Sequence, residues 1–295
     1  MAAHNVQRLT SMASQSCLVC VYLLFMQLLL AFAARPGNAY RAIPERLTPH
    51  EDVYTVNPAF SSRSVFETGI TQVVACDKLA ERLAVPAGHR VKLDRTEEYK
   101  AAAEKYYMGL VEDPELHVKL TGSWETLVGP DMDSFVHILE FENYTGYDRS
   151  MDLIRSSKHM ENYKALLPFI NSRWSQLCQE FAFFPSAPPH NEGGIFELRS
   201  YTLKPGSLLE WENAWRVGIE ARAKVIAPVG AWFSQVGRLH VVHHMWQYKD
   251  LNQRKLMREK AWSQQGWPET VVKTARLADI MDASILTPLS FSPLK

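Results

Sequence analysis

Residues 122–129 read GSWETLVG and residues 230–237 read GAWFSQVG, so both stretches follow the pattern G-x-W-x-x-x-V-G. After a turn, each is followed by an apolar run in which a histidine precedes an aromatic residue by four positions. The first run pairs His137 with Phe141, and the second pairs His244 with Tyr248. Self-similarity at a fixed spacing is the signature of a repeated structural unit. The sequence therefore predicts that the chain contains one module twice.

The second copy begins with a predicted strand and a predicted helix. Residues 195–203 (IFELRSYTL) are rich in β-formers and alternate apolar with polar residues, which is typical of a strand. Residues 207–210 (SLLE) predict a capping box, in which Ser207 and Glu210 accept from each other's backbone N–H. A helix should follow, and one of its faces carries Leu208, Trp211, Trp215, Ile219 and Arg222.

A hairpin, a helix and a last strand complete this copy. Residues 231–236 and 239–248 predict two strands joined at Gly237. Asp250 is expected to cap a helix that runs to about residue 265, and residues 283–289 suggest the last strand. The resulting order, β-α-β-β-α-β, is that of a ferredoxin-like unit.

The first copy repeats this order less clearly. Residues 89–93 predict a short strand, and Thr96 is expected to cap a helix that stops before Pro114. The remaining expected elements are strands near 120–128 and 135–141, helical segments from 148 and past 168 through 178, and a strand at 179–184. We therefore predict an α+β fold of two tandem ferredoxin-like modules of the dimeric α/β-barrel type, with their sheets packed face to face.

The packing prediction depends on the uncovered face of each four-stranded sheet. With both helices on one face, the other face would expose a large apolar patch, which a soluble monomer rarely tolerates. We expect this face to carry Trp124, Phe135 and His137 in the first copy, and Trp232 and Trp246 in the second. Either the two copies of one chain or copies from two chains can cover one another.

The segment before the repeat divides into two parts. Residues 1–44 contain no Asp or Glu and include an apolar run at 17–34, so we predict a targeting segment. A secretory signal cut near residues 31–33, a single membrane span and a mitochondrial transit peptide all remain open, and the residues alone favour the first slightly. We predict an irregular linker at 45–85, module one at 86–189 and module two at 190–295.

Composition excludes some classes of partner and site. Lys and Arg number 32, as do Asp and Glu, so net charge gives no argument for a nucleic-acid partner. Cys17 and Cys20 form a C-x-x-C motif, but Cys76 and Cys178 do not complete a zinc site or a disulfide framework. We predict neither a metal site nor a cofactor. Asn143 begins a glycosylation sequon that is usable only in the secretory pathway.

The second copy closely resembles the C-terminal module of the NIPSNAP family. The residues that carry the resemblance are FELRSYTLKPG (196–206), GAWFSQVG (230–237), VVHHMWQYKDL (241–251) and SFSPLK (290–295). The resemblance implies dimeric α/β-barrel modules, residence in mitochondria and a role in handling that organelle. It favours a mitochondrial location, with the secretory pathway or a membrane anchor through residues 17–34 as the alternative.

What the resemblance implies for function is protein binding rather than catalysis. Some members of the family are displayed on damaged mitochondria and recruit autophagy receptors and ubiquitin-like modifiers. We therefore expect a non-enzymatic adaptor linked to mitophagy, with protein partners, self-association into a homo-oligomer and peripheral or N-terminal membrane association. The alternative is a barrel that binds a small ligand or haem and resembles an oxygenase, because this fold also houses such families.

Seven residues are candidates for binding. His137, His244 and Arg199 are the candidate ligand contacts, although hydrogen-bonded histidines in the packing and an Arg199–carboxylate pair are the favoured interpretations. Tyr107 with Leu110, and Phe135 with Ile138, fit the aromatic-x-x-aliphatic pattern of segments that add a strand to an autophagy modifier. Both segments fall in predicted core elements, so core packing is favoured there too.

Overall fold

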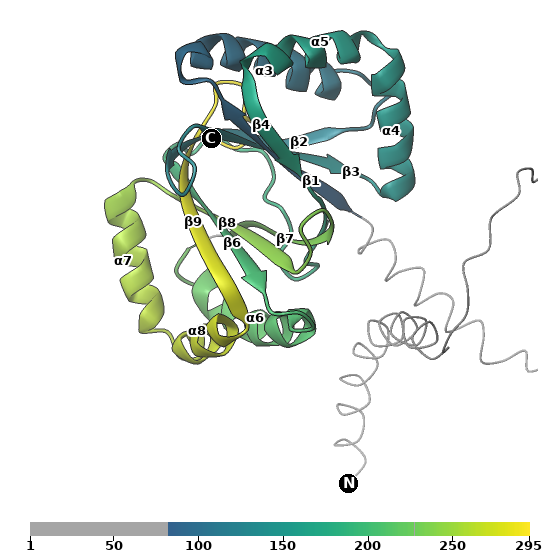
Figure 1. The fold of residues 1–295 in the computed structure, drawn as a ribbon. Helices are drawn as coiled ribbons and strands as arrows, with labels where there is room; N and C mark the ends of the chain where they lie inside the picture. The colour runs from purple at the N-terminus through teal and green to yellow at the C-terminus, as the bar shows by residue number, and fades with distance from the viewer. Residues whose placement is uncertain (1–81, 227) are drawn as a thin grey trace, which may run out of the picture. The chain divides into compact units, whose positions relative to one another are not determined.

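Both helices and strands form along residues 82–226 and 228–295, the part of the chain that the computed structural model describes (Figure 1). The predicted targeting segment and most of the predicted linker lie outside these residues, as do Cys17, Cys20 and Cys76. The first half consists of β1 (Leu83–Val91), a 3₁₀ turn η1 (Leu93–Arg95), α3 (Thr96–Val111), β2 (Lys119–Val128), β3 (Ser134–Phe141), α4 (Tyr144–Ser156), α5 (Lys158–Leu166), a 3₁₀ turn η2 (Leu167–Phe169), β4 (Ile170–Ser175) and β5 (Leu177–Glu180). The second half consists of β6 (Ile195–Leu203), α6 (Leu208–Ala223), β7 (Pro228–Val236), β8 (Val241–Tyr248), α7 (Leu251–Trp262), α8 (Trp267–Arg276) and β9 (Ala278–Pro288).

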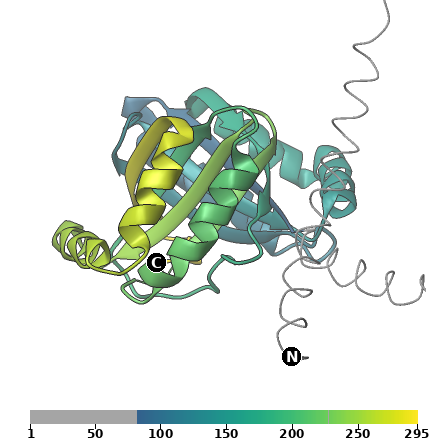
Figure 2. The same cartoon turned by 90° about the horizontal axis from the view of Figure 1, so that it is seen from below.

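Eight of the strands close into an antiparallel barrel. Neighbours in the first half follow the order β5-β1-β3-β2, and those in the second half follow β9-β6-β8-β7. The pairs β2–β9 and β5–β7 join the two halves, and β4 extends the pairing along β1. Figure 1 shows α3, α4 and α5 outside the first half and α6, α7 and α8 outside the second; Figure 2 gives the view from below. The barrel therefore closes within one chain.

Side chains from both halves fill the barrel interior. Trp124 and Val136 from the first half pack in one cluster with Phe196, Trp232 and Met245 from the second. Trp124 and Trp232 therefore occupy the inner face, as predicted. Phe135, His137 and Trp246 do not.

Strand register explains the correction for those three residues. Because Trp124 lies opposite Val136 on β3, the neighbouring Phe135 and His137 point outward to the helices. His243 on β8 lies opposite the inward-pointing Trp232 of β7, so His244 and Trp246 point outward. The prediction shifted β3 and β8 by one residue relative to their neighbouring strands. A shift of one residue moves every side chain of a strand to the opposite face.

Several predicted boundaries and caps are also wrong. Strand β1 begins at Leu83, inside the predicted linker 45–85, and residues 170–175 form strand β4 where helix was expected. Ser207 has a helical backbone and its side chain makes no cap hydrogen bond, while Thr96 is the first helical residue rather than a cap. The Asp250 cap is confirmed, since its carboxylate accepts from the backbone N–H of Gln253 at 2.7 Å.

The repeated G-x-W pattern has a steric cause. Gly122 and Gly230 lie two residues before Trp124 and Trp232 on the same face of their strands, and the indole ring covers each glycine. A Cβ at either position would lie closer to the ring than real Cβ contacts allow. The glycines therefore make room for the two indoles that fill the barrel.

We expect Gly122→Ala or Gly230→Ala to destabilise the protein by about 1–3 kcal/mol, because overpacking displaces a buried ring. Urea unfolding of the full chain measures this change. Gly109→Ala is the matched control, since a Cβ there would meet nothing nearer than 3.6 Å on helix α3. The free energy of unfolding of that control should rise by roughly 0.5–1 kcal/mol, because alanine replaces a glycine within a helix. Equal effects of all three substitutions would contradict the steric explanation.

Candidate functional site

A group of charged residues lies outside the barrel in the second half, between β6, β8 and the covering helices. On β6, Phe196 and Leu198 point to the interior, so Glu197, Arg199 and Tyr201 point outward. This alternation is the ordinary consequence of a strand with two buried faces. The unusual feature is that two of the three outward side chains are charged.

Glu197 is completely buried and is the centre of the group. Its Oε1 atom accepts from Arg199 Nη1 at 2.7 Å and from Arg254 Nη2 at 2.7 Å, and it lies 3.9 Å from Arg258 Nη1. Burial on its own would raise the pKa of Glu197, but the guanidinium groups of Arg254 and Arg199 outweigh it and lower the pKa to about 2. Glu197 is therefore a carboxylate at neutral pH.

Arg222 extends the group toward helix α6. Its guanidinium lies over the ring of Trp246 at 4.0 Å and over that of Trp267 at 4.9 Å from the centroids. Its Nη2 atom donates to the Tyr248 hydroxyl at 3.0 Å, and that hydroxyl donates to Glu197 Oε2 at 3.4 Å. Burial lowers the pKa of Arg222, yet a guanidinium keeps its charge at any ordinary pH.

His244 lies beside these residues as a neutral donor. Its Nδ1 atom accepts from the indole N–H of Trp246 at 2.7 Å, so the neutral ring carries its proton on Nε2. That Nε2 atom is buried and has no hydrogen-bond partner among the described residues. Burial, with Arg199 and Arg222 nearby, holds the pKa of His244 well below its ordinary value. The ring packs against Tyr201 and Trp215.

His137, the counterpart in the first half, is fully hydrogen-bonded. Its Nε2 atom lies 2.8 Å from the Tyr99 hydroxyl, and its Nδ1 atom lies 2.8 Å from the Ser123 hydroxyl. The Tyr99 hydroxyl also lies 2.7 Å from His89 Nδ1, and the ring of Tyr107 stacks on His137 at 4.1 Å. This closed network corresponds to the packing interpretation of His137. The two histidines therefore differ in one unpartnered N–H.

The two halves can be compared position by position. His137 lies opposite Ala87 on β1, as His244 lies opposite Arg199 on β6, and α3 and α6 have the same length of 16 residues. Asn143 and Asp250 cap α4 and α7 in the same manner. By this count the positions of Glu197, Arg199, Arg222, Tyr248, Arg254 and Arg258 are occupied in the first half by Val85, Ala87, Leu110, Phe141, Tyr147 and Met151. The same scaffold thus folds with apolar residues where the second half is charged.

The predicted partner-binding residues are buried. Tyr107 and Leu110 belong to the core of the first half with Phe135, and Ile138 points into the barrel. A strand-like contact through these residues would need their segments to leave the fold. Partner binding through them stays a prediction.

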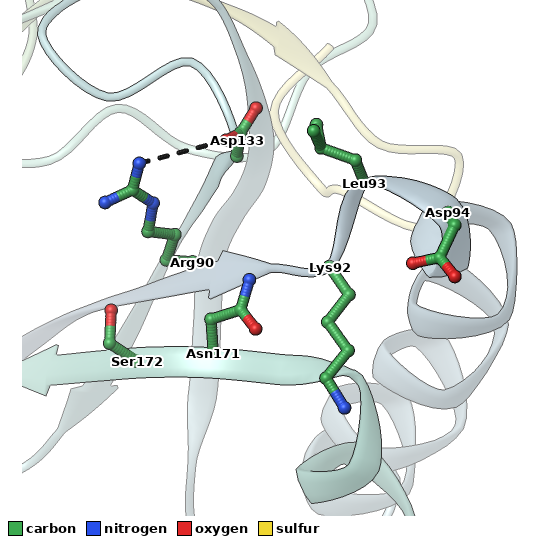
Figure 3. A pocket seen from close by; sticks show the side chains of 7 residues that line it. All are labelled: Arg90, Lys92, Leu93, Asp94, Asp133, Asn171 and Ser172. Carbon is green, nitrogen blue, oxygen red and sulfur yellow. Dashed lines mark ion pairs between the residues drawn. The ribbon is translucent and has the colours of Figure 1, made fainter.

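A pocket of about 550 Å³ lies at the end of β1 and β4 (Figure 3). Arg90 in this pocket lies 3.3 Å from Asp131 and 3.9 Å from Asp133, and the Lys92 ammonium donates to the Pro168 carbonyl at 2.6 Å. Both cationic side chains of this pocket, Arg90 and Lys92, thus already have partners within the protein. Neither this pocket nor a second one of about 740 Å³ beside Phe291 is lined by His137 or His244.

Residues 82–226 and 228–295 carry neither a cluster of metal ligands nor a membrane-spanning helix. They contain no group of three or more His, Cys, Asp or Glu side chains that could hold a metal ion. In the same part of the chain, no helix combines the length and the apolar character needed to cross a bilayer.

Sequence analysis identified His244 and Arg199 but missed Glu197, Tyr248, Arg254 and Arg258. A usable signal was present in the strand pattern, because Glu197 and Arg199 occupy alternate positions of a strand whose two faces are both covered. Arg222 was placed on the apolar face of its helix, which is where it lies. Contacts from α7 to β6 could not be read from sequence, since they depend on how the helix crosses the strand.

Comparison with known proteins identifies the family. The NIPSNAP family model matches residues 196–293. Protein NipSnap homolog 2 of Homo sapiens is 37% identical over 209 residues, which cover 70% of this chain and 73% of the relative. Protein NipSnap homolog 1 of Danio rerio is 35% identical over 211 residues, covering 70% of this chain and 75% of the relative.

A crystal structure from Lactobacillus acidophilus NCFM, described as a candidate monooxygenase, has the same fold. It superimposes with a TM-score of 0.54 at 12% identity and covers 71% of this chain and 95% of its own, which shows a dimeric α/β-barrel type of fold and no more. Identity above 30% across most of a relative's length is the stronger finding. This chain belongs to the NIPSNAP family.

Proposed function

We propose that this chain is a non-enzymatic NIPSNAP-type binding protein that acts in mitochondria as an adaptor linked to mitophagy and quality control. The observation that carries the proposal is the 37% identity with a NipSnap homolog over 209 residues. The side chains of both halves fill the barrel interior, which supports a role that depends on surfaces. Autophagy receptors and ubiquitin-like modifiers are the proposed partners.

We also propose that the barrel consists of two tandem ferredoxin-like units and that the protein forms homo-oligomers. Each half has the same strand order around its first strand, which supports the duplication. Size-exclusion chromatography with light scattering of the full chain tests the oligomer. A monomer at all concentrations would contradict that part.

Location and partners are tested in cells with the full chain. We expect the protein in the mitochondrial fraction, with protease protection that defines its side of the membrane and an unglycosylated Asn143 in mass spectra of the mature protein. A glycan on Asn143 would instead place the chain in the secretory pathway. Pull-downs from depolarised mitochondria should return an autophagy receptor or modifier, and pull-downs that return neither count against the adaptor role.

A second candidate is a barrel that binds a small ligand, for which haem is the first probe. The unpartnered Nε2 of His244 favours a ligand that accepts a hydrogen bond, because a buried donor without an acceptor is costly unless a ligand supplies one. Haem titration of the purified chain should then give a Soret band that His244→Ala abolishes. Because Nε2 carries the proton while Trp246 donates to Nδ1, iron ligation would first require that proton to leave. Titration without a band excludes haem as the ligand.

A further inference from the structure

The charged group described above contains four guanidinium groups and one carboxylate. Arg199, Arg254 and Arg258 surround Glu197, while Arg222 reaches it through the Tyr248 hydroxyl. Among the described residues, no other carboxylate forms an ion pair with any of the four arginines. With one negative and four positive charges, the group has a net charge of about +3 at neutral pH.

This excess is not required by the fold. The equivalent positions of the first half carry Val85, Ala87, Leu110, Tyr147 and Met151 in place of the carboxylate and the four arginines. Val85, Leu110, Tyr147 and Met151 pack in the first half's core. Charged groups that are partly removed from water without enough counter-charge destabilise a protein. A chain that keeps them in only one of its two halves has a use for them.

The group also has more buried hydrogen-bond donors than acceptors to receive them. The Nε atoms of Arg222 and Arg254 are buried and have no partner among the described residues, as is also true of His244 Nε2. All three atoms are donors, because guanidinium nitrogens accept no hydrogen bond and His244 carries its proton on Nε2. These donors lack acceptors. An oxyanion offers acceptors together with the negative charge that the group lacks.

The guanidinium groups can also be reached from solvent. The side chains of Arg199, Arg254 and Arg258 are 16%, 25% and 33% exposed. Arg254 and Arg258 lie on α7, whose only buried residue in the described structure is Ala261. These three side chains therefore meet solvent without any opening of the barrel core.

We propose that the second half binds a small molecule through a carboxylate or phosphate group, held by Arg199, Arg254 and Arg258 with Glu197 as the positioning residue that orients them. The bidentate fork of a guanidinium matches both kinds of oxyanion. This inference gives the small-ligand candidate a ligand class, and it does not depend on the adaptor role.

The test measures anion binding to the purified full chain. Isothermal titration is performed with sodium orthophosphate and with sodium acetate, at an ionic strength kept constant with sodium chloride. We expect saturable binding of at least one anion, with the Kd raised tenfold or more by Arg254→Gln and by Arg258→Gln. Thermal unfolding of each variant confirms that it is folded, and Arg258 is the safer site because it is the most exposed of the three.

Lys255→Gln is the matched control, because it removes one positive charge from the same helix at a side chain that is 71% exposed. This variant should bind like the unchanged protein. Binding of orthophosphate alone would support the proposal with a phosphate ligand, and binding of acetate alone would support it with a carboxylate. Binding of neither anion, or equal loss of affinity in Lys255→Gln and Arg258→Gln, would overturn it while leaving the location and pull-down experiments unaffected.

Discussion

Acidification from pH 7.5 to pH 5 is expected to remove about 4 kcal/mol from the free energy of unfolding through His89 and His243, because these buried histidines stay neutral in the folded state. Burial lowers the pKa of His89 and of His243 from 6.5 to about 4, with Arg173 adding to the effect at His89. Burial also holds the pKa of His137 and His244 well below 6.5. His89 and His243 each contribute roughly 2 kcal/mol over this range, since one pKa unit corresponds to 1.36 kcal/mol. His137 and His244 act in the same direction.

The sign follows from where the protons bind. Below pH 6.5 the unfolded chain protonates these four histidines while the folded chain does not, so stability falls as pH falls. The loss begins near pH 6.5 and continues until the folded-state pKa values are reached, near 4 for His89 and His243. Since domains are typically stable by about 5–15 kcal/mol, a loss of this size removes a large part of the stability by pH 5.

Urea unfolding at a series of pH values measures the number of protons taken up. His243→Gln should lower that number by about one, because an amide can still bond to Gln176 or Ser200, the two partners of His243, but does not titrate. His117→Asn is the control, since His117 is exposed and its positive φ of 49° suits asparagine. A free energy of unfolding that stays constant between pH 7.5 and 5 would show that the four rings are not buried as described.

Sequence reasoning predicted those features of the fold that repeat. The duplicated G-x-W pattern located the two indoles of the barrel interior, and alternation along residues 195–203 located β6 with its bounds unchanged. It was wrong about which face of β3 and β8 each side chain occupies, because a register shift of one residue moved His137 and Trp246 to the wrong face. Local capping patterns also failed at Ser207, where the backbone conformation competes with the cap.

The candidate site was predicted only in part, for a physical reason. Arg199 and His244 are both strand residues with recognisable chemistry, and strand pairing places them opposite each other. The predicted pair of Arg199 with a nearby carboxylate is confirmed, and that carboxylate belongs to Glu197. What sequence did not contain was the approach of α7, which brings Arg254 and Arg258 to the same carboxylate. An excess of charge is visible only once distant segments are brought together.

Glu197→Gln is expected to lower the free energy of unfolding by about 3–5 kcal/mol, because it leaves one buried and three partly exposed guanidinium groups without a counter-charge. The pKa of Glu197 gives a similar value, since a shift from 4.5 to about 2 corresponds to about 3 kcal/mol. That contribution is present above pH 4.5 and is lost as pH falls toward 2, because the folded-state pKa is the lower one. Glu161→Gln is the control, since its pair with Lys164 is exposed at both side chains and should contribute less than 1 kcal/mol.

Replacing the whole charged group at once tests whether its charges are needed for folding. Replacing Glu197, Arg199, Arg222, Tyr248, Arg254 and Arg258 together with the residues of the first half (Val, Ala, Leu, Phe, Tyr and Met) removes the carboxylate and its guanidiniums at once. Because a well-packed apolar replacement of a buried ion pair is often neutral or stabilising, we expect this variant to recover most of the stability that Glu197→Gln loses. Urea unfolding at pH 7.5 checks this, and a combined variant less stable than Glu197→Gln would mean that the charges hold α7 to the barrel. Recovery of stability would instead show that the second half keeps its charges for something other than folding.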